Sequence, residues 1–445
     1  MSKSYDKNSI ESLSPLEFTR LKPGVYAGDT TYATQLLVEI LSNSIDEYRL
    51  GHGNQIDITI DKDIVTVQDY GQGFLVNEIR EDGKTVLEAA FSVLNTSGKY
   101  REDGTYEGTS LGSFGIGSKI TTFLSHKLRV KTFRDGKSEL IDFVEGVFSE
   151  RKIEECDKDK HGTIVCWTPS EEFFTHTEVE INKVKTLFQT LVCLCPGLTI
   201  VLTEEHKKIT YYHSDNGIDD LVTNAIGDKE LINNRFHMNY ENNKNKIDMV
   251  FTYTSNYSST IVPYVNTGLT ESGQHITQIK TTITRVFNKF FKEKGWLKEN
   301  DENLTGDDIQ EGMYIVFNIT APGVAYDAQV KSRVTKIDMT PFIGPFTEEL
   351  EYWLVNNEKD VKGIADKAIN ARRARQAAKR AREAARGQVK KKEKVVKFDT
   401  KLADCFSKDR LNCEIYIVEG DSAAGNLKTA RDNEFQAVMP VRGKR

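Results

Sequence analysis

The spacing of apolar residues in the first two hundred positions predicts alternating helices and strands. A helix is predicted over 34–50, because apolar side chains there recur every three or four residues. Two strands follow at 56–60 and 64–67, where every second residue is apolar. The same patterns predict four more strands and one helix, at 127–133, 139–148, 163–168, 198–203 and 177–193. Together these elements predict a mixed α/β layer.

A second block of elements begins near residue 210. Strand-like runs at 248–254 and 313–320 lie on either side of a long helical pattern over 274–292. Residues 345–386 are strongly helical, and we expect that helix to end at Gly387. A last apolar run, at 414–418, predicts one more strand. The chain of 445 residues is therefore expected to hold two or three domains.

Composition is that of an ordinary globular protein, with 38% hydrophobic and 28% charged residues. No run of 18 apolar residues predicts a membrane span, and the polar N-terminus does not resemble a secretory signal. Six cysteines are scattered without zinc-site spacing, which predicts reduced thiols in a cytoplasm.

The net charge of -6 hides one strongly basic segment. Residues 372–397 carry twelve Lys and Arg against two Glu, an excess of ten that leaves the rest of the chain near -16. A basic block on an acidic protein indicates a local contact with a polyanion. The alternative is a solvated helix face.

Four polar residues of the predicted helix 34–50 share one face. Glu39, Asn43, Asp46 and Glu47 stand at spacings of four, seven and eight residues from the first. Such a face can place a general base one helical turn from a metal ligand. A solvated helix surface is the alternative for this pattern taken alone.

Two glycine-containing segments follow. Asp69, Gly71 and Gly73 come directly after the strand 64–67, where glycines allow a flat ligand to approach the backbone and the carboxylate can accept from an amine. A second run, 112–117, precedes an apolar helix and offers free backbone N–H groups to phosphates. A tight turn and a flexible connection are the respective alternatives. The second run matches neither the Walker loop nor the Rossmann spacing.

These motifs, in this order and followed by Gly162 and Thr163 on a strand, resemble the Bergerat ATP fold of gyrase, MutL proteins, histidine kinases and the ninety-kilodalton chaperones. Three further features resemble the gyrase B subunit of type II topoisomerases. They are the N-terminal segment with Tyr5, the loop from Gln329 to Lys331, and the acidic run that begins at Glu419. The last resembles the opening of a TOPRIM domain.

The resemblance implies an α+β protein of several domains. A Bergerat (GHKL) ATP-binding α/β sandwich with an N-terminal dimerisation arm is expected over 1–208. A ribosomal-S5-like transducer domain with a long basic C-terminal helix is expected over 209–387. A linker, 388–400, and the N-terminal fragment of a TOPRIM domain, 401–445, complete the expected organisation.

The resemblance also implies roles for single residues. Glu39 is expected to be the general base for ATP hydrolysis and Asn43 the protein ligand of Mg²⁺. Asp69 is expected to bind the adenine amine, with Lys331 at the γ-phosphate and Glu419 as a catalytic, metal-binding residue for DNA cleavage. The other expected nucleotide-binding residues are Tyr5, Asp46, Glu47, Gly71, Gly73, Lys99, Gly112, Ser113, Phe114, Gly115, Ile116, Gly117, Thr163 and Gln329.

The implied function is an ATP-driven clamp: a homodimer that closes on double-stranded DNA when ATP binds, and works with a breakage-reunion subunit that carries the catalytic tyrosine. A cytoplasmic location without membrane contact is expected. A MutL-like or chaperone-like clamp without DNA cleavage is the alternative, and a non-enzymatic DNA-binding protein is a third. The sequence departs from the family pattern at Gln72, Phe74, Leu75, Leu140 and Val330, which suggests a divergent lineage such as a viral one.

Overall fold

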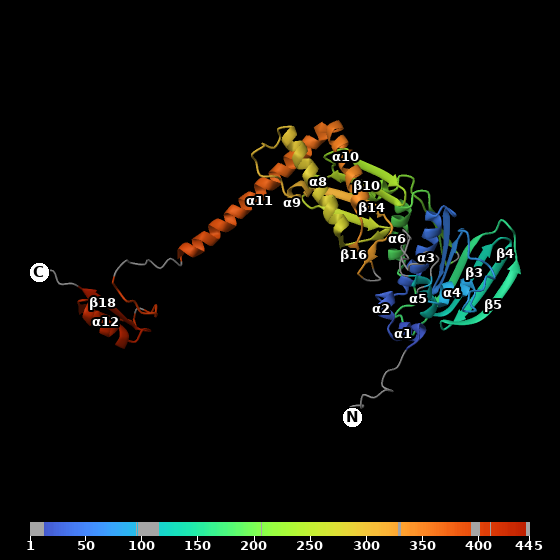
Figure 1. Cartoon of the computed structure of the whole chain (residues 1–445), viewed down its shortest axis with the longest axis horizontal. Helices are drawn as coiled ribbons and strands as arrows, with labels where there is room; N and C mark the ends of the chain where they lie inside the picture. Colours follow the sequence, from blue (N-terminus) through green and yellow to red (C-terminus); the bar gives the residue numbers. More distant parts are fainter. Residues whose placement is uncertain are drawn as a thin grey trace, which may run out of the picture. The chain divides into compact units, whose positions relative to one another are not determined.

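The computed structural model describes residues 13–94, 96, 115–205, 207–327, 331–392, 401–409 and 411–441, without the side chains of 385 and 387–392. The chain forms two compact units, Met1–Arg372 and Arg373–Arg445. Figure 1 labels helices and strands of both units.

The first half of unit one is built on an eight-stranded sheet in the order β5-β4-β3-β6-β2-β1-β7-β8. The β1–β7 pair is parallel, and the other described pairs of this sheet are antiparallel. Buried and less buried residues alternate along β1, β2 and β6, so one face of the sheet is the core face. The strands are β1 (Gln55–Asp61), β2 (Ile64–Asp69), β3 (Ser125–Arg134), β4 (Lys137–Val144), β5 (Val147–Glu155), β6 (Gly162–Pro169), β7 (Thr199–Glu204) and β8 (Lys208–Tyr212).

Helices cover that sheet and bury its core face (Figure 1). The predicted helix 34–50 is confirmed as α3, whose apolar positions are almost fully buried against α5 and β2. The helices of this half are α1 (Pro15–Leu21), α2 (Pro23–Ala27), α3 (Thr34–Arg49), α4 (Val86–Ser92), α5 (Gly117–Phe123) and α6 (Ile181–Leu194).

The second half of unit one holds a five-stranded sheet, β12-β11-β14-β10-β9, and a small sheet, β13-β16-β15. Alternate residues of β10 face opposite sides: Met249 and Phe251 join the core under α8 and α10, whereas Val250 joins a smaller cluster with α7. The strands are β9 (Phe236–Asn242), β10 (Asn245–Tyr253), β11 (Thr260–Val265), β12 (Gly268–Leu269), β13 (Ser272–Gly273), β14 (Met313–Thr320), β15 (Ala325–Tyr326) and β16 (Arg333–Lys336). The helices are α7 (Ile218–Ile226), α8 (Gln274–Glu293), α9 (Gly306–Gln310) and α10 (Thr340–Asn356).

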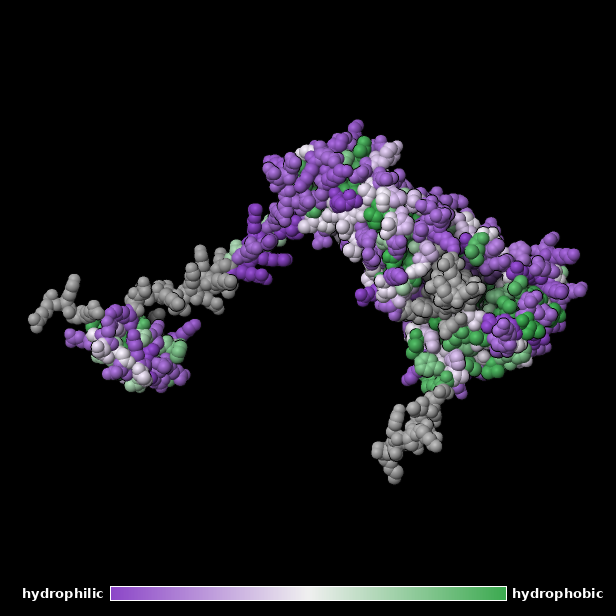
Figure 2. Space-filling view, viewed as in Figure 1, coloured by the Kyte–Doolittle hydropathy of each residue, from purple (hydrophilic) through white to green (hydrophobic). Residues whose placement is uncertain are grey.

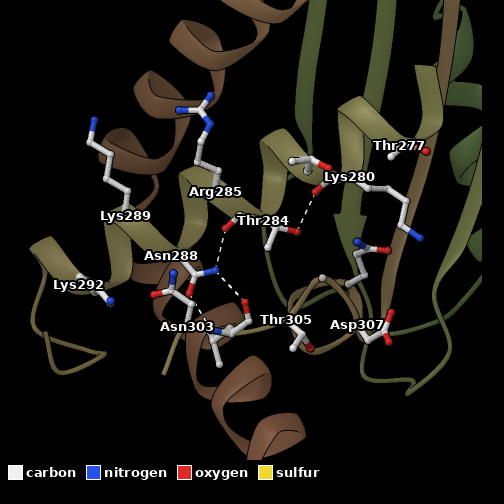
Figure 3. A pocket seen from close by; sticks show the side chains of 14 residues that line it. Thr277, Lys280, Thr284, Arg285, Asn288, Lys289, Lys292, Asn303, Thr305 and Asp307 are labelled. Carbon is white, nitrogen blue, oxygen red and sulfur yellow. Dashed lines mark hydrogen bonds between the residues drawn. The ribbon is translucent and has the colours of Figure 1, made fainter. Parts of the chain in front are cut away.

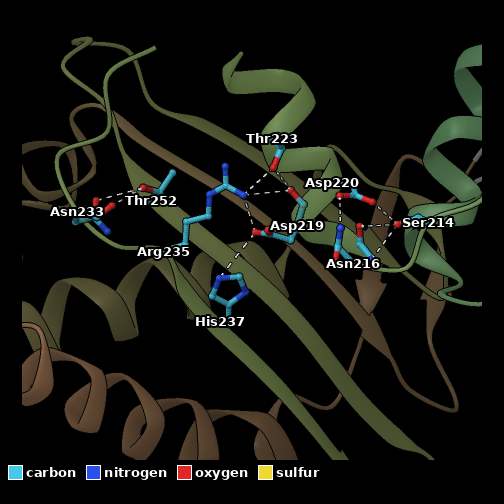
Figure 4. Close-up of polar contacts among 10 residues, drawn as sticks. Ser214, Asn216, Asp219, Asp220, Thr223, Asn233, Arg235, His237 and Thr252 are labelled. Carbon is cyan, nitrogen blue, oxygen red and sulfur yellow. Dashed lines mark hydrogen bonds and ion pairs between the residues drawn. The ribbon is translucent and has the colours of Figure 1, made fainter. Parts of the chain in front are cut away.

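Polar contacts fix α7 on the outer side of this sheet (Figure 4). Arg235, just before β9, donates to Asp219 Oδ1 and Thr223 Oγ1, both at 2.8 Å. At the start of the helix, Asp220 accepts from Ser214 Oγ at 2.7 Å and from Asn216 Nδ2 at 3.0 Å. The apolar side of α7 faces the sheet, so both sheet faces are covered.

The structure differs from the helical segment predicted over 345–386 in three respects, the first being that the segment begins at Thr340. It divides at Asn357 into α10 and α11 (Glu358–Lys392), and α11 continues past the predicted end at Gly387. A glycine in a helix interior costs only about 1 kcal/mol relative to alanine, so it does not by itself end a helix. The described side chains from Arg373 to Arg386 are almost all exposed, and Figure 2 shows the hydrophilic surface that they form.

Unit two contains a βαβ arrangement. The parallel strands β17 (Glu414–Glu419) and β18 (Gln436–Val441) are joined by α12 (Asp421–Ala430), and the predicted strand 414–418 is confirmed. Val438 and Ala424 are buried between these elements, whereas Ile415 and Ile417 are exposed. No helix within the described ranges is long and apolar enough to cross a membrane.

Candidate functional site

A cavity of about 530 Å³ lies where four separate segments of unit one meet. Glu39 and Asn43 come from α3, Asp69 from the end of β2, Thr163 from β6 and Gly117 from the start of α5. Gly115, Ile116, Glu47 and Gly73 also line it. The structure therefore brings together residues from all four sequence motifs.

The acidic residues of α3 have different surroundings. Glu39 is 7% exposed, and its Oε1 accepts from Gln35 Nε2 at 2.8 Å. Asn43, one turn later, is exposed at the cavity. Glu47 Oε2 accepts from the backbone N–H of Gln72 at 3.1 Å and so holds the loop after β2. Asp46 is 5% exposed and is not among the cavity-lining residues of the described chain.

Asp69 is held as a hydrogen-bond acceptor inside the cavity. Its Oδ1 accepts from the backbone N–H groups of Gly71 at 3.0 Å and Thr163 at 3.2 Å, and its Oδ2 lies 3.3 Å from Ser44 Oγ. Burial raises the pKa of this carboxyl to about 6, and the nearby Glu47 adds to the rise. The backbone N–H groups oppose that rise, so the carboxylate still predominates at neutral pH.

Three glycines leave no room for a side chain. A Cβ on Gly117 would lie 2.2 Å from Glu39 Oε2, and a Cβ on Gly71 would lie 2.7 Å from Glu47 Cγ. Gly73, with φ of +71°, would bring a Cβ to 2.3 Å from the backbone oxygen of Phe133. The glycines thus let the helix start and the loop approach the carboxylates closely.

Several predicted site residues are not part of this cavity as described. Gly71 supports Asp69 and Lys331 lies in the loop between β15 and β16, but neither lines the cavity. Glu419 ends β17 in unit two. Tyr5, Lys99, Gly112, Ser113, Phe114 and Gln329 lie outside the described residues. Among the described residues, no group of three or more His, Cys, Asp or Glu side chains is placed to hold a metal ion.

Sequence reasoning missed Lys119. It lies in the first turn of α5, is 4% exposed and lines the cavity, with its Nζ donating to the backbone oxygen of Thr96 at 2.8 Å. Burial lowers the pKa of this amine to about 8. A lysine among the apolar residues Ile116, Ile120 and Phe123 was the signal that could have identified it.

A second cavity, of about 740 Å³, runs along α8. Figure 3 shows that Lys280, Arg285, Lys289 and Lys292 all come from this helix, and that Arg285 and Lys289 point away from Asn303 and Asp307 on the other wall of the groove. Arg285 donates to Thr347 Oγ1 and Lys289 pairs with Glu351 at 2.9 Å, whereas Lys280 and Lys292 form no ion pair within the described part of the chain. Four cationic side chains and one carboxylate, that of Asp307, therefore line the groove.

Comparison with known proteins decides the family. A family model described as DNA gyrase B matches residues 217–384. The DNA gyrase B protein of Enterococcus faecalis is 36% identical over 453 residues, which cover 99% of this chain and 70% of that protein. The chain belongs to the DNA gyrase B family. The gyrase B protein of Thermotoga maritima is 35% identical over 461 residues, with 99% and 71% coverage.

Solved structures agree with membership of the gyrase B family. The 43K ATPase domain of Thermus thermophilus gyrase B, in complex with an aminocoumarin, has a TM-score of 0.66 and 27% identity, covering 83% of this chain and 98% of that one. The ATPase region of Saccharomyces cerevisiae topoisomerase II has a TM-score of 0.60 at 17% identity, with 79% and 99% coverage, and shows the fold alone. The predicted GHKL sandwich followed by a transducer is thereby confirmed.

Family membership identifies the chain as an ATP-binding subunit of a type II topoisomerase. The alternative of a MutL-like or chaperone-like clamp does not account for gyrase B relatives that match 99% of the chain.

Proposed function

We propose that this chain hydrolyses ATP in the cavity between α3, β2, β6 and α5, and uses the hydrolysis to operate a DNA clamp. The observation that carries the proposal is the meeting of Glu39, Asn43, Asp69 and Gly117 around one cavity of nucleotide size. A buried carboxylate can serve as a general base, an amide oxygen as a Mg²⁺ ligand and a helix start as a phosphate site, so this set of groups suits ATP hydrolysis.

Each group has a distinct task. Asp69, fixed by two backbone N–H groups, accepts from the adenine amine. The start of α5 and Lys119 face the phosphates, where backbone N–H groups and an ammonium stabilise negative charge. Glu39, kept in place by Gln35 and packed against Gly117, removes the proton of the attacking water.

The residues around Asn43 suit Mg²⁺. Mg²⁺ prefers oxygen ligands and is often held by one or two protein groups together with substrate phosphates. Asn43 supplies such an oxygen at the cavity surface, and the described residues form no cage of three or more protein ligands. When bound, Mg²⁺ neutralises phosphate charge. Asn43 is the residue of this chain that would hold it.

Further parts of the proposal extend beyond the cavity. Lys331, in the transducer loop between β15 and β16, reaches the γ-phosphate when the domains close, with Gln329 beside it. Two chains then close as a homodimer around double-stranded DNA, and the N-terminal segment with Tyr5 crosses to the other chain. The basic groove on α8 and the exposed arginines of α11 contact the DNA phosphates.

DNA cleavage needs a partner subunit that carries the nucleophilic tyrosine. Glu419, at the end of β17, is the acidic residue that this chain contributes to a Mg²⁺-dependent cleavage site. We place the assembly in the cytoplasm, where DNA and ATP are both available.

The experiment that tests the proposal compares Glu39→Ala with the unsubstituted chain. We expect phosphate release to fall at least ~100-fold, the scale of a lost general base. Binding of a non-hydrolysable ATP analogue should persist, and light scattering should still show nucleotide-driven dimers. Asn43→Ala should instead lose the Mg²⁺-dependent part of binding. Normal turnover in Glu39→Ala would contradict the assignment.

A further inference from the structure

The last residue of the nucleotide-binding helix α3 also contacts the transducer sheet. Arg49 Nη2 donates to Thr320 Oγ1 at 3.0 Å, and Nη1 lies 3.5 Å from the backbone oxygen of Asn266. Thr320 ends β14 and Asn266 follows β11. One helix therefore carries Glu39 and Asn43 at the cavity and, nearly two turns later, a guanidinium bound to the second domain.

The transducer side of this contact is a strained turn. Asn266 and Thr267 connect β11 to β12 with φ of 51° and 69°, and both are buried. A β-branched residue such as threonine strongly disfavours positive φ. Such a conformation persists only where its surroundings enforce it, and it marks a place where strain can serve function.

Side chains of the turn and its neighbours hold it rigidly. The side-chain amide of Asn266 makes two hydrogen bonds with the backbone of Ala321. Its Oδ1 accepts from the N–H at 3.0 Å, and its Nδ2 donates to the carbonyl oxygen at 3.1 Å. The N–H of Thr267 donates to Asn318 Oδ1 at 3.2 Å. A turn fixed in this way moves as one piece with β14.

The same segment holds both strands that flank the Lys331 loop. Before the loop, Tyr326 donates its hydroxyl to the backbone oxygen of Val265 at 3.4 Å. After the loop, the N–H of Glu271 donates to the oxygen of Ser332 at 2.7 Å, and β13 pairs with β16. Residues 265–273 thus contact Arg49 on one side and the residues that flank the loop on the other.

We propose that Arg49 and the Asn266–Thr267 turn form a coupling joint between α3 and the Lys331 loop. Arg49 is a positioning residue. Any displacement of α3 must either break the hydrogen bonds of Arg49 or move the rigid turn. The segment that contains the turn contacts the strands on both sides of Lys331. This inference rests on the proposed function, since it assumes that Lys331 acts on the nucleotide bound beside α3.

The joint is distinct from the apolar contact between the same domains. Leu194 of α6 packs with α7 and the outer face of the transducer sheet, in a cluster whose described members are apolar or aromatic and come from elements other than α3. Loss of Arg49 should therefore leave the domains associated while it uncouples their positions.

Steady-state kinetics provide the first test. Arg49→Met keeps the side-chain length but removes the guanidinium, and should lower kcat at least ~10-fold, the scale of one lost charge-assisted hydrogen bond. The Kd of a non-hydrolysable ATP analogue should change by less than about threefold, because only positioning is lost. Arg49→Lys should restore part of kcat. The matched control is Arg129→Met, which removes an exposed bidentate pair with Asp142 in the first sheet and should change neither quantity beyond about twofold.

Hydrogen exchange of the full chain without nucleotide provides the second test, and does not depend on hydrolysis. Amides of 325–327 and 331–336 should exchange roughly tenfold faster in Arg49→Met than in Arg129→Met, with α3 itself unchanged. Should Arg49→Met fail to fold, Thr320→Val removes the acceptor hydroxyl at nearly constant volume and should act in the same direction. Unchanged exchange in the loop of Arg49→Met, or equal losses of kcat and of ATP-analogue affinity, would contradict the proposed joint. If the unsubstituted chain does not hydrolyse ATP, the proposed function is contradicted. The exchange experiment still tests whether the proposed joint exists.

Discussion

At the scale of single residues, the contact between Gly117 and Glu39 sets the position of the expected general base. A methyl group at residue 117 would lie 2.2 Å from Glu39 Oε2, closer than any packed contact. The carboxylate is buried and held by Gln35 on its other oxygen, so it cannot move aside without losing that bond.

Gly117→Ala is therefore expected to lower kcat by roughly 100-fold, as if the base were displaced. The measurement is phosphate release at saturating ATP. The matched control is Gly24→Ala in α2, where nothing lies within 4 Å of the added methyl group; it should retain activity, since alanine is favoured over glycine in a helix. Full activity in Gly117→Ala would show that the carboxylate can act from another position.

Asp69 illustrates a conflict between function and stability. Its pKa in the folded state is about 6, above the ordinary value, so the fold favours the neutral form and becomes less stable as pH rises from about 4 to about 6. Nucleotide binding needs the opposite form, because the adenine amine requires an acceptor. ATP affinity should consequently weaken as pH falls through about 6.

Asp69→Asn separates these effects. The amide oxygen can keep the bonds from Gly71 and Thr163, while its NH₂ group presents a donor where the adenine amine also donates. We expect a higher Tm than the unsubstituted chain at pH 7.5, with no difference below pH 4, and ATP affinity weaker by about 100-fold. Calorimetric titration and thermal melts measure both. A variant that is no more stable at pH 7.5 would contradict the burial argument.

At the scale of elements, the start of α8 contains a histidine that burial keeps neutral. His275 has no exposed surface, its Nε2 lies 2.9 Å from Thr270 Oγ1, and its Nδ1 has no hydrogen-bond partner among the described residues. Burial lowers the pKa of His275 to about 4. The unfolded chain binds a proton at this residue below about pH 6.5, and the folded chain does not.

Stability is therefore expected to fall as pH decreases from 6.5 toward 4, by roughly 2 kcal/mol at pH 5 from this residue. His275→Leu removes the titrating group, so its melting temperature should decrease less than that of the unsubstituted chain over the same range. The difference between the two pH profiles isolates His275 from the exposed histidines, which both chains share. Parallel profiles would show that the ring is accessible to protons.

The sequence predicted elements well where one face is strongly apolar. α3, α8 and β14 appear within one or two residues of the expected bounds, because tertiary packing reinforces their periodicity. The predicted strand 139–148 is confirmed as β4 only to Val144: the chain then turns at Glu145 and Gly146, both with positive φ, and β5 begins at Val147. Apolar residues on both sides of this turn hid it. β9 and β11 were not predicted.

The sequence predicted those parts of the site that lie within one short segment of the chain. The sequence indicated α3, the loop after β2 and the start of α5, because each carries its own motif. Lys119 was missed since its role depends on burial, which a motif does not report. The contact of Arg49 with Thr320 joins residues 271 positions apart and has no local signature at all.

At the scale of the whole molecule, the chain has a net negative charge but carries local surfaces that are basic. Lys280 and Lys292 line the α8 groove without an ion pair among the described residues, so their charge is available to a polyanion. Arg372 at the middle of α11, by contrast, donates to the backbone oxygen of Glu302 at 2.8 Å and serves the fold. We therefore expect the groove lysines to contribute to DNA binding through phosphates, with no preference for sequence.

The last prediction concerns DNA-stimulated hydrolysis. Reversing Lys280 and Lys292 together to Glu should weaken stimulation by DNA and reduce the salt slope of binding by roughly one to two units, because each lost phosphate contact releases one counterion fewer. Basal ATPase activity should stay unchanged, since neither residue lines the nucleotide cavity. The control, Lys183→Glu with Lys208→Glu, makes the same change of net charge on exposed residues of the first domain. If both pairs of substitutions reduce stimulation equally, the stimulation of ATP hydrolysis by DNA depends only on the net charge of the protein. The groove on α8 is then not a DNA-binding surface.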